Sequence, residues 1–307
     1  MTGTVLVLGA SGLFGGRVAV AFAAAGWQVR RYQRGTDMAR AAAGADVIVN
    51  GLNPPMYHEW GRLIPQITDQ VIAAGLASGA TVLQPGNIYV YGNQPGPWGP
   101  DTPHLPVARK GQIRVAMEQC LRQATTQGLR VILLRGGDFL DEAGKTTAMQ
   151  SFHLRALKAG KITLGGAADV LRAYAYLPDM ARAAVALAEQ RANLAAFTDV
   201  AFAGLTFSMI ELQAELERQL GQPLQMTQFP WWMMRLLGPF WELARELPEM
   251  RYLFDVPHQL DGGPLRALLP HLQVTPLATV IAGHLQAMAL GLGRSGQGNI
   301  HPDRTVA

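Results

Sequence analysis

The sequence predicts an α/β protein whose main domain is a doubly wound parallel sheet, followed by a smaller C-terminal substrate lobe. The first reason is that short, β-rich apolar runs alternate with helical patterns from residue 1 to about 135, as in consecutive βαβ units. The second is a glycine loop between the first run and the first helix. The third is size, because 307 residues, 49% of them apolar, can bury one large core with a second lobe attached.

Five apolar runs have the length and residue types of buried parallel strands. They are TVLVLG (4–9), QVRRYQR (28–34), DVIVNGL (46–52), TVLQPG (81–86) and LRVILLRGG (129–137). Helices are expected between them at 14–26, about 57–79 and about 106–127. This alternation predicts a Rossmann-like architecture, in which ligands bind at the carboxyl ends of the strands.

After about residue 136 the segments are longer and more mixed. We expect a helix near 146–159, a strand at 161–165, a helix from Pro178, a strand near 197–202 and a helix at 206–220. The predicted domains are 1–170 for the Rossmann-like domain with later strands returning near 171–204, 205–290 mainly for the substrate lobe, and 291–307 for a flexible tail that lacks apolar periodicity.

The charge pattern and the cysteine count narrow the functional class. The chain has 26 basic and 22 acidic residues without a basic run, so no nucleic-acid partner is expected. The single cysteine, Cys120, excludes an intrachain disulfide, and its place among apolar helix positions predicts a small buried side chain in a reduced compartment. The seven histidines lack metal-site spacing, so no metal is expected.

Two apolar segments bear on location. The first apolar run leads directly into the glycine loop, which is typical of a strand and not of a signal peptide, so we expect a cytoplasmic protein. The stretch FPWWMMRLLGPFW (229–241) is shorter than the roughly 20 apolar residues of a membrane span. It is expected to form a lid or core helix, and no membrane partner is predicted.

The loop VLGASGLFGG places Gly9, Gly12 and Gly15 three residues apart, after a strand and before a helix. Glycines allow the backbone to turn tightly and to approach a pyrophosphate, which then lies at the positive N-terminus of the helix. The hydroxyl of Ser11 is a further donor. The predicted cofactor-binding residues in this loop are Gly9, Ser11, Gly12, Leu13, Phe14 and Gly15.

The end of the second strand carries arginines where an acidic residue would favour the free 2′-hydroxyl of NAD. Arg31 and Arg34 lie there, and the first acid is Asp37. Arginine accommodates a 2′-phosphate, so NADP(H) is predicted over NAD(H), although Arg34 is also compatible with an ordinary surface position. The remaining predicted cofactor contacts are Asn50, Gly51, Leu52, Pro85, Lys110 and Gly136.

Six motifs occur in the order found in one enzyme superfamily. They are GASGLFG (9–15), ADVIVNGL (45–52), VYG (90–92), a helix with Glu118, LLRGGDF (133–139) and RAYAYLPDMARA (172–183). Over roughly residues 4–290 the chain resembles an atypical or extended short-chain dehydrogenase/reductase of the epimerase/dehydratase type. The resemblance implies a nicotinamide cofactor, a small-molecule substrate and a homodimer formed through the helices near 57–79 and 106–127.

The same resemblance implies a catalytic Ser or Thr and a Tyr-x-x-x-Lys pair, and this chain replaces all three. Counted from Glu118, the tyrosine position falls on Lys110 and the lysine position on Arg114, while the Ser/Thr position falls on Asn87. Arg114 stays charged and can hold a ribose or an anionic oxygen. Lys110 beside a second cation is a candidate base or oxyanion donor, or else a solvated helix lysine.

The segment KGQIRVAME is also similar to isoflavone reductase-like enzymes, in which a lysine at the position of Lys110 is catalytic. Tyr89 and Tyr91 are rival acids, and Tyr89 is the one that can turn toward the pocket. Asp138 is either a second catalytic carboxylate or a cap of the loop after the fifth strand. We take Lys110, Arg114, Asn87, Tyr89 and Asp138 as the catalytic candidates.

The substrate side is less defined by the sequence. Arg172 and Arg251 match, by resemblance, arginines that meet substrate phosphate in sugar-nucleotide enzymes. Trp231 and the aromatic residues around it would suit an apolar substrate under a cap, or simply pack a helix. Three functions follow: an NADP(H)-dependent oxidoreductase acting on a small apolar or aromatic carbonyl compound with Lys110 as proton donor, a nucleotide-sugar epimerase or dehydratase, and a non-catalytic NADP(H)-binding sensor.

Overall fold

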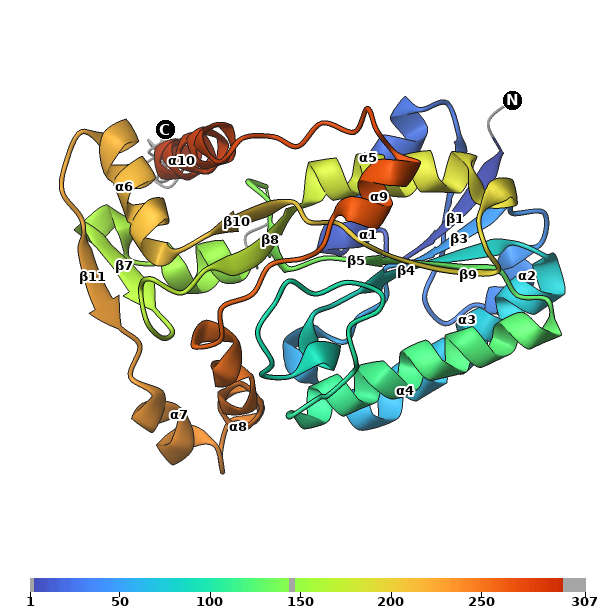
Figure 1. Ribbon diagram of the computed structural model, residues 1–307, viewed down its shortest axis with the longest axis horizontal. Coiled ribbons are helices and arrows are strands. Elements are labelled where there is room, and N and C mark those ends of the chain that lie inside the picture. Colours follow the sequence, from blue (N-terminus) through green and yellow to red (C-terminus); the bar gives the residue numbers. More distant parts are fainter. Residues whose placement is uncertain (1–2, 144–146, 295–307) are drawn as a thin grey trace, which may run out of the picture.

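The computed structural model describes residues 3–143 and 147–294, and its main feature is a six-stranded parallel sheet (Figure 1). The strand order is β2-β1-β3-β4-β5-β9. The strands are β1 (Thr4–Leu8), β2 (Gln28–Arg31), β3 (Val47–Asn50), β4 (Thr81–Gly86), β5 (Val131–Arg135) and β9 (Phe197–Ala201). The predicted doubly wound parallel sheet is confirmed, with each of the five N-terminal strands at its expected place.

Helices cover both faces of this sheet (Figure 1). Helices α1 (Leu13–Ala24) and α5 (Leu177–Glu189) pack on one face, and α2 (Met38–Ala42), α3 (Trp60–Ser78) and α4 (Arg109–Ala124) pack on the other. Successive side chains of a strand point to opposite faces, so β1 divides its residues between two cores. Val5 and Val7 join the α1–α5 side, whereas Leu6 and Leu8 join the α3–α4 side. Such burial on both faces explains the unbroken apolar run.

The chain order creates a switch point beside β1. From β1 the chain moves to β2 on one side and then returns to β3 on the other. Leu8 and Asn50 are register partners at the ends of β1 and β3, so Gly9 and Gly51 leave the sheet side by side. Connections that diverge at the carboxyl ends of adjacent strands leave a crevice, which is where open α/β sheets bind ligands.

The second lobe contains two small sheets and two helices. Strands β6 (Asp138–Leu140), β8 (Arg172–Tyr176) and β10 (Leu205–Phe207) form one sheet, β7 (Lys161–Leu164) pairs in parallel with β11 (Gln225–Gln228), and α6 (Met209–Leu220) and α10 (Leu277–Arg294) pack on them. The sequence placed 1–170 in the nucleotide-binding domain with later strands returning to it. Of the strands at 171–204, β9 joins the large sheet and β8 does not. Strands β6 and β7, which lie within 1–170, also pair in the second lobe.

Three local expectations are corrected. The helix expected near 146–159 is a π-helical turn at Met149–His153 and a 3-10 turn at Leu157–Ala159, and Gly160, at φ 69°, ends the second turn ahead of β7. Cys120 is exposed, since it lies off the buried arc of α4. Helix α10 continues to Arg294, so the predicted tail at 291–307 begins as helix, and its residues 295–307 lie outside the described part.

A cap closes one end of the second lobe. We use this name for residues 231–254, which comprise α7 (Trp231–Leu237), α8 (Glu242–Glu246) and the 3-10 segment η7 (Pro248–Phe254). In Figure 1 the cap lies at the lower left, and α8 contacts η1 (Pro55–Tyr57), the turn before α3. Within the described residues, no helix has both the length and the apolar character needed to cross a bilayer.

Candidate functional site

The glycine loop is a close meeting of three backbone segments. Gly9 has φ 71°, and a Cβ added to it would lie 2.6 Å from the carbonyl oxygen of Gly51. A Cβ on Gly15 would lie 2.3 Å from the carbonyl oxygen of Gly9. Both positions therefore require glycine, one for its left-handed backbone and one because α1 crosses so near the loop. Gly12 is the N-cap of α1 and supplies no side-chain acceptor, so the helix N-terminus is left to a ligand or water.

A cavity of about 440 Å³ opens at this loop and gathers residues predicted from separate motifs. It is lined by Gly9, Ala10, Ser11, Arg31, Tyr32, Arg34 and Leu52. Donors at a helix N-terminus together with two arginines favour an anionic ligand. Phe14, by contrast, is buried in the core and stacks on Phe139, with the ring centroids 6.3 Å apart. Its side chain therefore stabilises α1 instead of lining the cavity, and the adjoining Leu13 also packs against that core.

Other predicted cofactor residues lie at or next to the carboxyl ends of β3, β4 and β5. The amide of Asn50 donates to Gln84 Oε1 at 2.7 Å, and Asn50 Oδ1 accepts the backbone N–H of Leu52. Gln84 in turn donates to the carbonyl of Pro85. A Cβ on Gly136 would lie 3.1 Å from Met180 Sδ, so this glycine permits α5 to pack closely behind β5.

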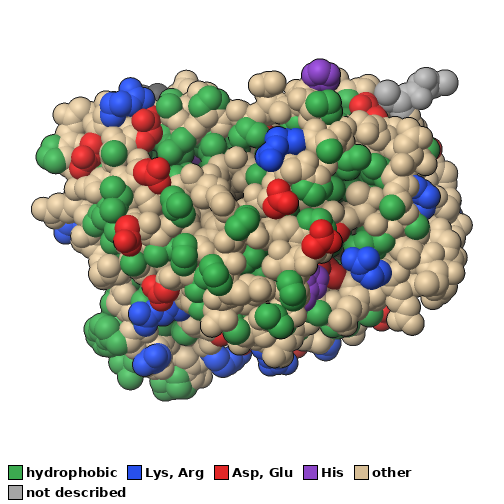
Figure 2. All heavy atoms as spheres, viewed as in Figure 1, with side chains coloured by type: hydrophobic (Ala, Val, Ile, Leu, Met, Phe, Trp, Pro, Cys, Tyr) green, Lys and Arg blue, Asp and Glu red, His purple; other side chains and the backbone are tan. Residues whose placement is uncertain are grey.

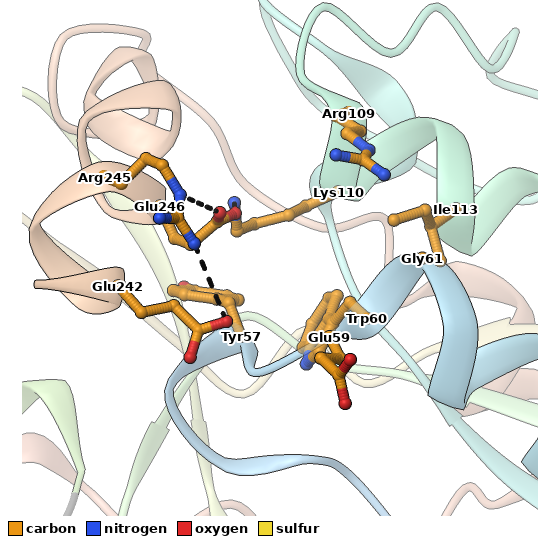
Figure 3. A pocket seen from close by; sticks show the side chains of 10 residues that line it. All are labelled: Tyr57, Glu59, Trp60, Gly61, Arg109, Lys110, Ile113, Glu242, Arg245 and Glu246. Atoms are coloured by element: carbon orange, nitrogen blue, oxygen red, sulfur yellow. Dashed lines mark hydrogen bonds and ion pairs between the residues drawn. The ribbon is translucent and has the colours of Figure 1, made fainter. Parts of the chain in front are cut away.

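Lys110 is held by two carboxylates of the cap, those of Glu246, which Figure 3 shows, and Glu249. Its ammonium donates to Glu246 Oε2 at 2.7 Å and to Glu249 Oε1 at 2.6 Å, while the ring of Tyr57 lies 4.8 Å from Nζ. Only 2% of the Lys110 side chain is exposed. Burial alone would raise the pKa of Glu246, but the bonds from Lys110 and Arg245 lower it overall. Lys110 therefore joins α4 to the cap, which is a contact that the sequence did not predict.

Arg114 lies one turn further along α4 and is also buried. One of its terminal nitrogens donates to Asn53 Oδ1 at 2.6 Å, and its guanidinium lies 4.5 Å from the centre of the Trp60 ring. Burial lowers the pKa of Arg114, although the group stays cationic near neutral pH. Its Nε has no hydrogen-bond partner among the described residues.

Two tyrosine hydroxyls meet beside these cations. Tyr57 Oη and Tyr89 Oη are 3.4 Å apart, and both side chains are partly exposed. Burial raises the pKa of both phenols, and that of Tyr89 rises well above its usual value while the charge of Arg114 opposes the rise. Tyr91 is excluded from this pair, because it is buried and its hydroxyl donates to the carbonyl of Gly99.

Asn87 has a structural part in this loop. Its Oδ1 accepts the backbone N–H of Tyr89, and its carbonyl accepts a hydrogen bond from Arg135 at 2.7 Å. Arg135 is fully buried and also pairs with Glu118 and Asp199. Through Arg135, Glu118 thus holds Asn87 and the adjoining turn η2 (Tyr89–Tyr91) in place.

Asp138 and Arg172 form an ion pair at the start of the second lobe. Arg172 is buried, stacks 4.3 Å from the ring centre of Phe254, and donates to His153 Nε2 at 3.4 Å. His153 donates from Nδ1 to the carbonyl of Thr163, so the neutral tautomer satisfies both contacts. Burial, together with the charge of Arg172, lowers the pKa of His153 to about 4.

Two predicted substrate residues lie apart from both cavities. Trp231 is buried among cap and lobe aromatics, and its indole N–H donates to the carbonyl of Gly165 at 2.7 Å. Arg251 is exposed and lies 3.8 Å from Asp255. Neither residue lines the crevice at Gly9 or the smaller cavity of Figure 3.

The smaller cavity, of about 190 Å³, lies where the cap meets α3 and α4 (Figure 3). Its lining residues are Tyr57, Glu59, Trp60, Gly61, Arg109, Lys110, Ile113, Glu242, Arg245 and Glu246. His58, next to it, bonds Glu242 at 2.8 Å, which is a second tie between the cap and the loop before α3. Among residues 3–143 and 147–294, no cluster of three His, Cys, Asp or Glu side chains suits a metal ion.

The sequence did not identify Tyr57, Asn53, Glu246 or Glu249 as parts of this site. Tyr57 lies in a loop where Met56, Tyr57 and Glu59 all have left-handed φ, at 52°, 63° and 44°. Non-glycine residues in this region are uncommon, and such positions cluster at functional sites. The sequence PPMYHEW carries no signal for that conformation.

Solved structures with the same arrangement cover nearly the whole chain. MoeE5 in complex with UDP-glucose and NAD superposes with a TM-score of 0.76 at 16% identity, over 94% of this chain and 100% of that one. The chain has the fold of the nucleotide-sugar epimerases. This epimerase fold recurs in a nucleoside-diphosphate-sugar epimerase from Pseudomonas aeruginosa, with a TM-score of 0.70 and 19% identity over 95% of this chain and 99% of that one.

A third example of the epimerase fold comes from Bacillus cereus. Its UDP-glucuronic acid 4-epimerase, in complex with UDP-glucuronic acid and NAD, has a TM-score of 0.73 and 16% identity over 94% of this chain and 99% of that one. No protein-family model and no curated protein matches the sequence. The likeness therefore lies in the backbone, and it includes the second lobe as well as the large sheet.

Proposed function

We propose that this protein is a nicotinamide-dinucleotide-dependent enzyme of the epimerase or dehydratase type, that it acts on a nucleotide sugar, and that it prefers NADP(H) to NAD(H). The observation that carries the proposal is the cavity at the β1–β3 switch point, where the glycine loop meets Arg31 and Arg34. The cavity combines a phosphate-binding turn with two cations at the end of the second strand.

The residues around this cavity fit a dinucleotide. The pyrophosphate would be held by the backbone at Gly9 and Gly12 and by the hydroxyl of Ser11. Gly9 itself must be glycine, because an added Cβ would meet the carbonyl of Gly51. Arg31 and Arg34 would bind the 2′-phosphate that distinguishes NADP from NAD. When bound, the nicotinamide ring takes up or returns a hydride at the substrate carbon.

Tyr89 is our candidate for proton transfer. Burial raises the pKa of its phenol, so Tyr89 stays protonated near neutral pH, and it would give this proton to the keto oxygen in the half-reaction that returns a hydroxyl to the sugar. Tyr57, 3.4 Å away, orients this hydroxyl, and Arg114 supplies positive charge near the pair. In this proposal Lys110 is a positioning residue, since two carboxylates occupy its ammonium.

The cap argues for a nucleotide sugar over a small apolar carbonyl compound. Its aromatic residues do not form an apolar pocket over the tyrosine pair, because Trp231 is buried in its own cluster and Trp232 and Phe240 point into solvent. The solved structures of the epimerase fold that contain UDP-sugars match this chain in both lobes. These two observations support the epimerase or dehydratase activity.

The test has a binding step and a turnover step. Thermal shifts with NADPH, NADP, NADH and NAD should show stabilisation, larger for the phosphorylated cofactors, and Gly9→Ala should abolish it. Turnover of UDP-sugars should then fall at least about a hundredfold in Tyr89→Phe, the range for loss of a general acid, with cofactor binding retained. Absence of any dinucleotide shift would refute the proposal, and full activity in Tyr89→Phe would remove Tyr89 from it.

A second candidate is cofactor binding without turnover. It is favoured by the ion pairs that occupy Lys110 and by the absence of a tyrosine at that position. The two functions differ in one measurement: incubation of a UDP-sugar with the oxidised cofactor yields the epimer or the dehydrated sugar only if the protein is an enzyme.

A further inference from the structure

The outer side of the cap exposes a group of large apolar side chains. We call this group the cap tip, and its members are Trp232, Met233, Leu236, Leu237, Phe240 and Trp241. Phe240 is 90% exposed, and Trp232 and Leu236 are each more than 65% exposed. Figure 2 shows hydrophobic side chains gathered at the lower left of the molecule, where Figure 1 places α7. Contiguous exposed apolar patches mark contact with a partner, whereas single ones need no explanation.

Arg235 is the only charged residue in the segment 229–241, which contains the whole cap tip. Residues 229–241 contain no Asp or Glu, and Arg235 lies among the apolar side chains without an ion-pair partner in the described part of the chain. The nearest acids along the chain, Glu242 and Glu246, contact His58 and Lys110 on the inner side of the cap. The tip therefore offers aromatic rings, aliphatic chains and a free cation.

We propose that the cap tip docks on the surface of an anionic lipid bilayer. Tryptophan and phenylalanine with leucine beside arginine is the composition of segments that lie in the membrane interface, where rings and aliphatic chains enter the acyl boundary and the cation meets lipid phosphate. Helix α7, at seven residues, is too short to span a bilayer, so a contact with lipid would be confined to the surface. This departs from the expectation of no membrane partner, and it is independent of the proposed enzymatic activity.

A second copy of this chain fits the cap tip less well. A two-fold contact apposes the same patch from both subunits, so it would bring two copies of Arg235 into an apolar interface with no acidic residue from 229–241 to pair with them. Anionic lipid supplies the missing negative charge. The charge pattern thus selects the bilayer.

The test is co-sedimentation of the full chain with vesicles of phosphatidylcholine, with and without phosphatidylglycerol, together with tryptophan emission. We expect binding to the phosphatidylglycerol vesicles with a blue shift of the emission, and little binding to phosphatidylcholine alone. Phe240→Asp should weaken the binding about tenfold or more, and Arg235→Gln should weaken it and reduce its salt dependence. Ile210→Asp, at another exposed apolar position, is the matched control and should bind as the unmodified chain does.

All these side chains are exposed, so the variants should fold, and circular dichroism checks this. No binding to either vesicle type, equal binding to both, or binding that survives Phe240→Asp would each overturn the proposal. Sedimentation velocity without lipid tests whether a second copy of the chain binds the cap tip instead. Self-association that Phe240→Asp abolishes, combined with no lipid binding, would assign the cap tip to a second copy of the chain.

Discussion

Glu249 accepts two hydrogen bonds from Lys110 at a single carboxylate oxygen. The ammonium donates to Oε1 at 2.6 Å and the backbone N–H of Lys110 donates to the same atom at 3.2 Å. The backbone bond satisfies one of the N–H groups left free in the first turn of α4. Glu249 thus caps α4 and pairs with the lysine at once, across 139 positions of sequence.

The first prediction concerns this contact. The double variant Glu246→Gln, Glu249→Gln leaves the buried Lys110 ammonium without a charged partner and should lower the free energy of unfolding by about 2–3 kcal/mol. Lys110→Met should cost less, about 1 kcal/mol, because the two glutamates are 25% and 31% exposed and can turn to water. Urea unfolding measures both. An equal loss of unfolding free energy in both variants would show that the buried ammonium does not depend on the two carboxylates more than they depend on it.

The second prediction concerns cofactor choice. Arg34→Ser should weaken NADPH binding about tenfold, the loss of a charged hydrogen bond at an exposed site, and leave NADH binding unchanged. Arg40→Ser is the matched control, since Arg40 is an exposed arginine outside the cavity. Isothermal titration gives both constants. If Arg34→Ser weakened both cofactors equally, Arg34 would not read the 2′-phosphate.

The third prediction is a pH dependence of the cap. The hydrogen bond to Glu242 raises the pKa of His58 above its usual value, so the folded protein binds this proton more tightly than the unfolded chain does. The contribution of the pair is complete below the ordinary histidine pKa of about 6.5 and is lost as the pH rises through the raised value. NMR titration of the His58 ring proton should show the raised pKa, and Glu242→Gln should return it toward about 6.5. The same pKa in both proteins would refute the contact.

The fourth prediction concerns acid sensitivity. The folded pKa of His153 is lowered to about 4, so the unfolded chain takes up this proton first as the pH falls. The contribution of His153 should leave stability constant above about pH 7 and lower it between about pH 6.5 and 4, by at most about 3 kcal/mol. Burial lowers the pKa of His258 to about 4 as well, which steepens the decline.

Unfolding in urea at a series of pH values tests this. His153→Gln should flatten part of the decline, whereas His271→Gln, at an exposed histidine, should not change it. An unaltered pH profile in His153→Gln would show that its imidazole is protonated as easily in the folded protein as in the unfolded chain.

The large sheet and the residues at the crevice were predictable because the signals for them are local. Gly9, Ser11 and Arg34 each lie within a few residues of a strand end, and the order of strands and helices places those ends together. No such rule connects Lys110 to Glu246, which lie 136 positions apart and meet only because the cap folds back over α4. The sequence therefore located the lysine and gave no basis for its partners.

The second lobe was harder to predict for a related reason. Strand β7 pairs with β11, and β6 with β8, so neighbours in space come from segments with other elements between them. The loop at Tyr57 shows a further limit. Its backbone conformation is imposed by contacts such as the bond from the Trp60 indole to the Pro54 carbonyl, since none of its residues prefers a left-handed φ.

The left-handed backbone of that loop makes the tyrosine pair depend on contacts from the cap. Holding Met56, Tyr57 and Glu59 in left-handed backbone costs roughly 1 kcal/mol or more at each, and contacts elsewhere must offset that cost. One of them, His58 to Glu242, comes from the cap. If the cap swings away, the loop is free to relax and the Tyr57 hydroxyl to withdraw from Tyr89. The contacts of the cap thus stabilise the phenol pair as well as the loop, and variants that remove them should lower the fraction of molecules with a complete site.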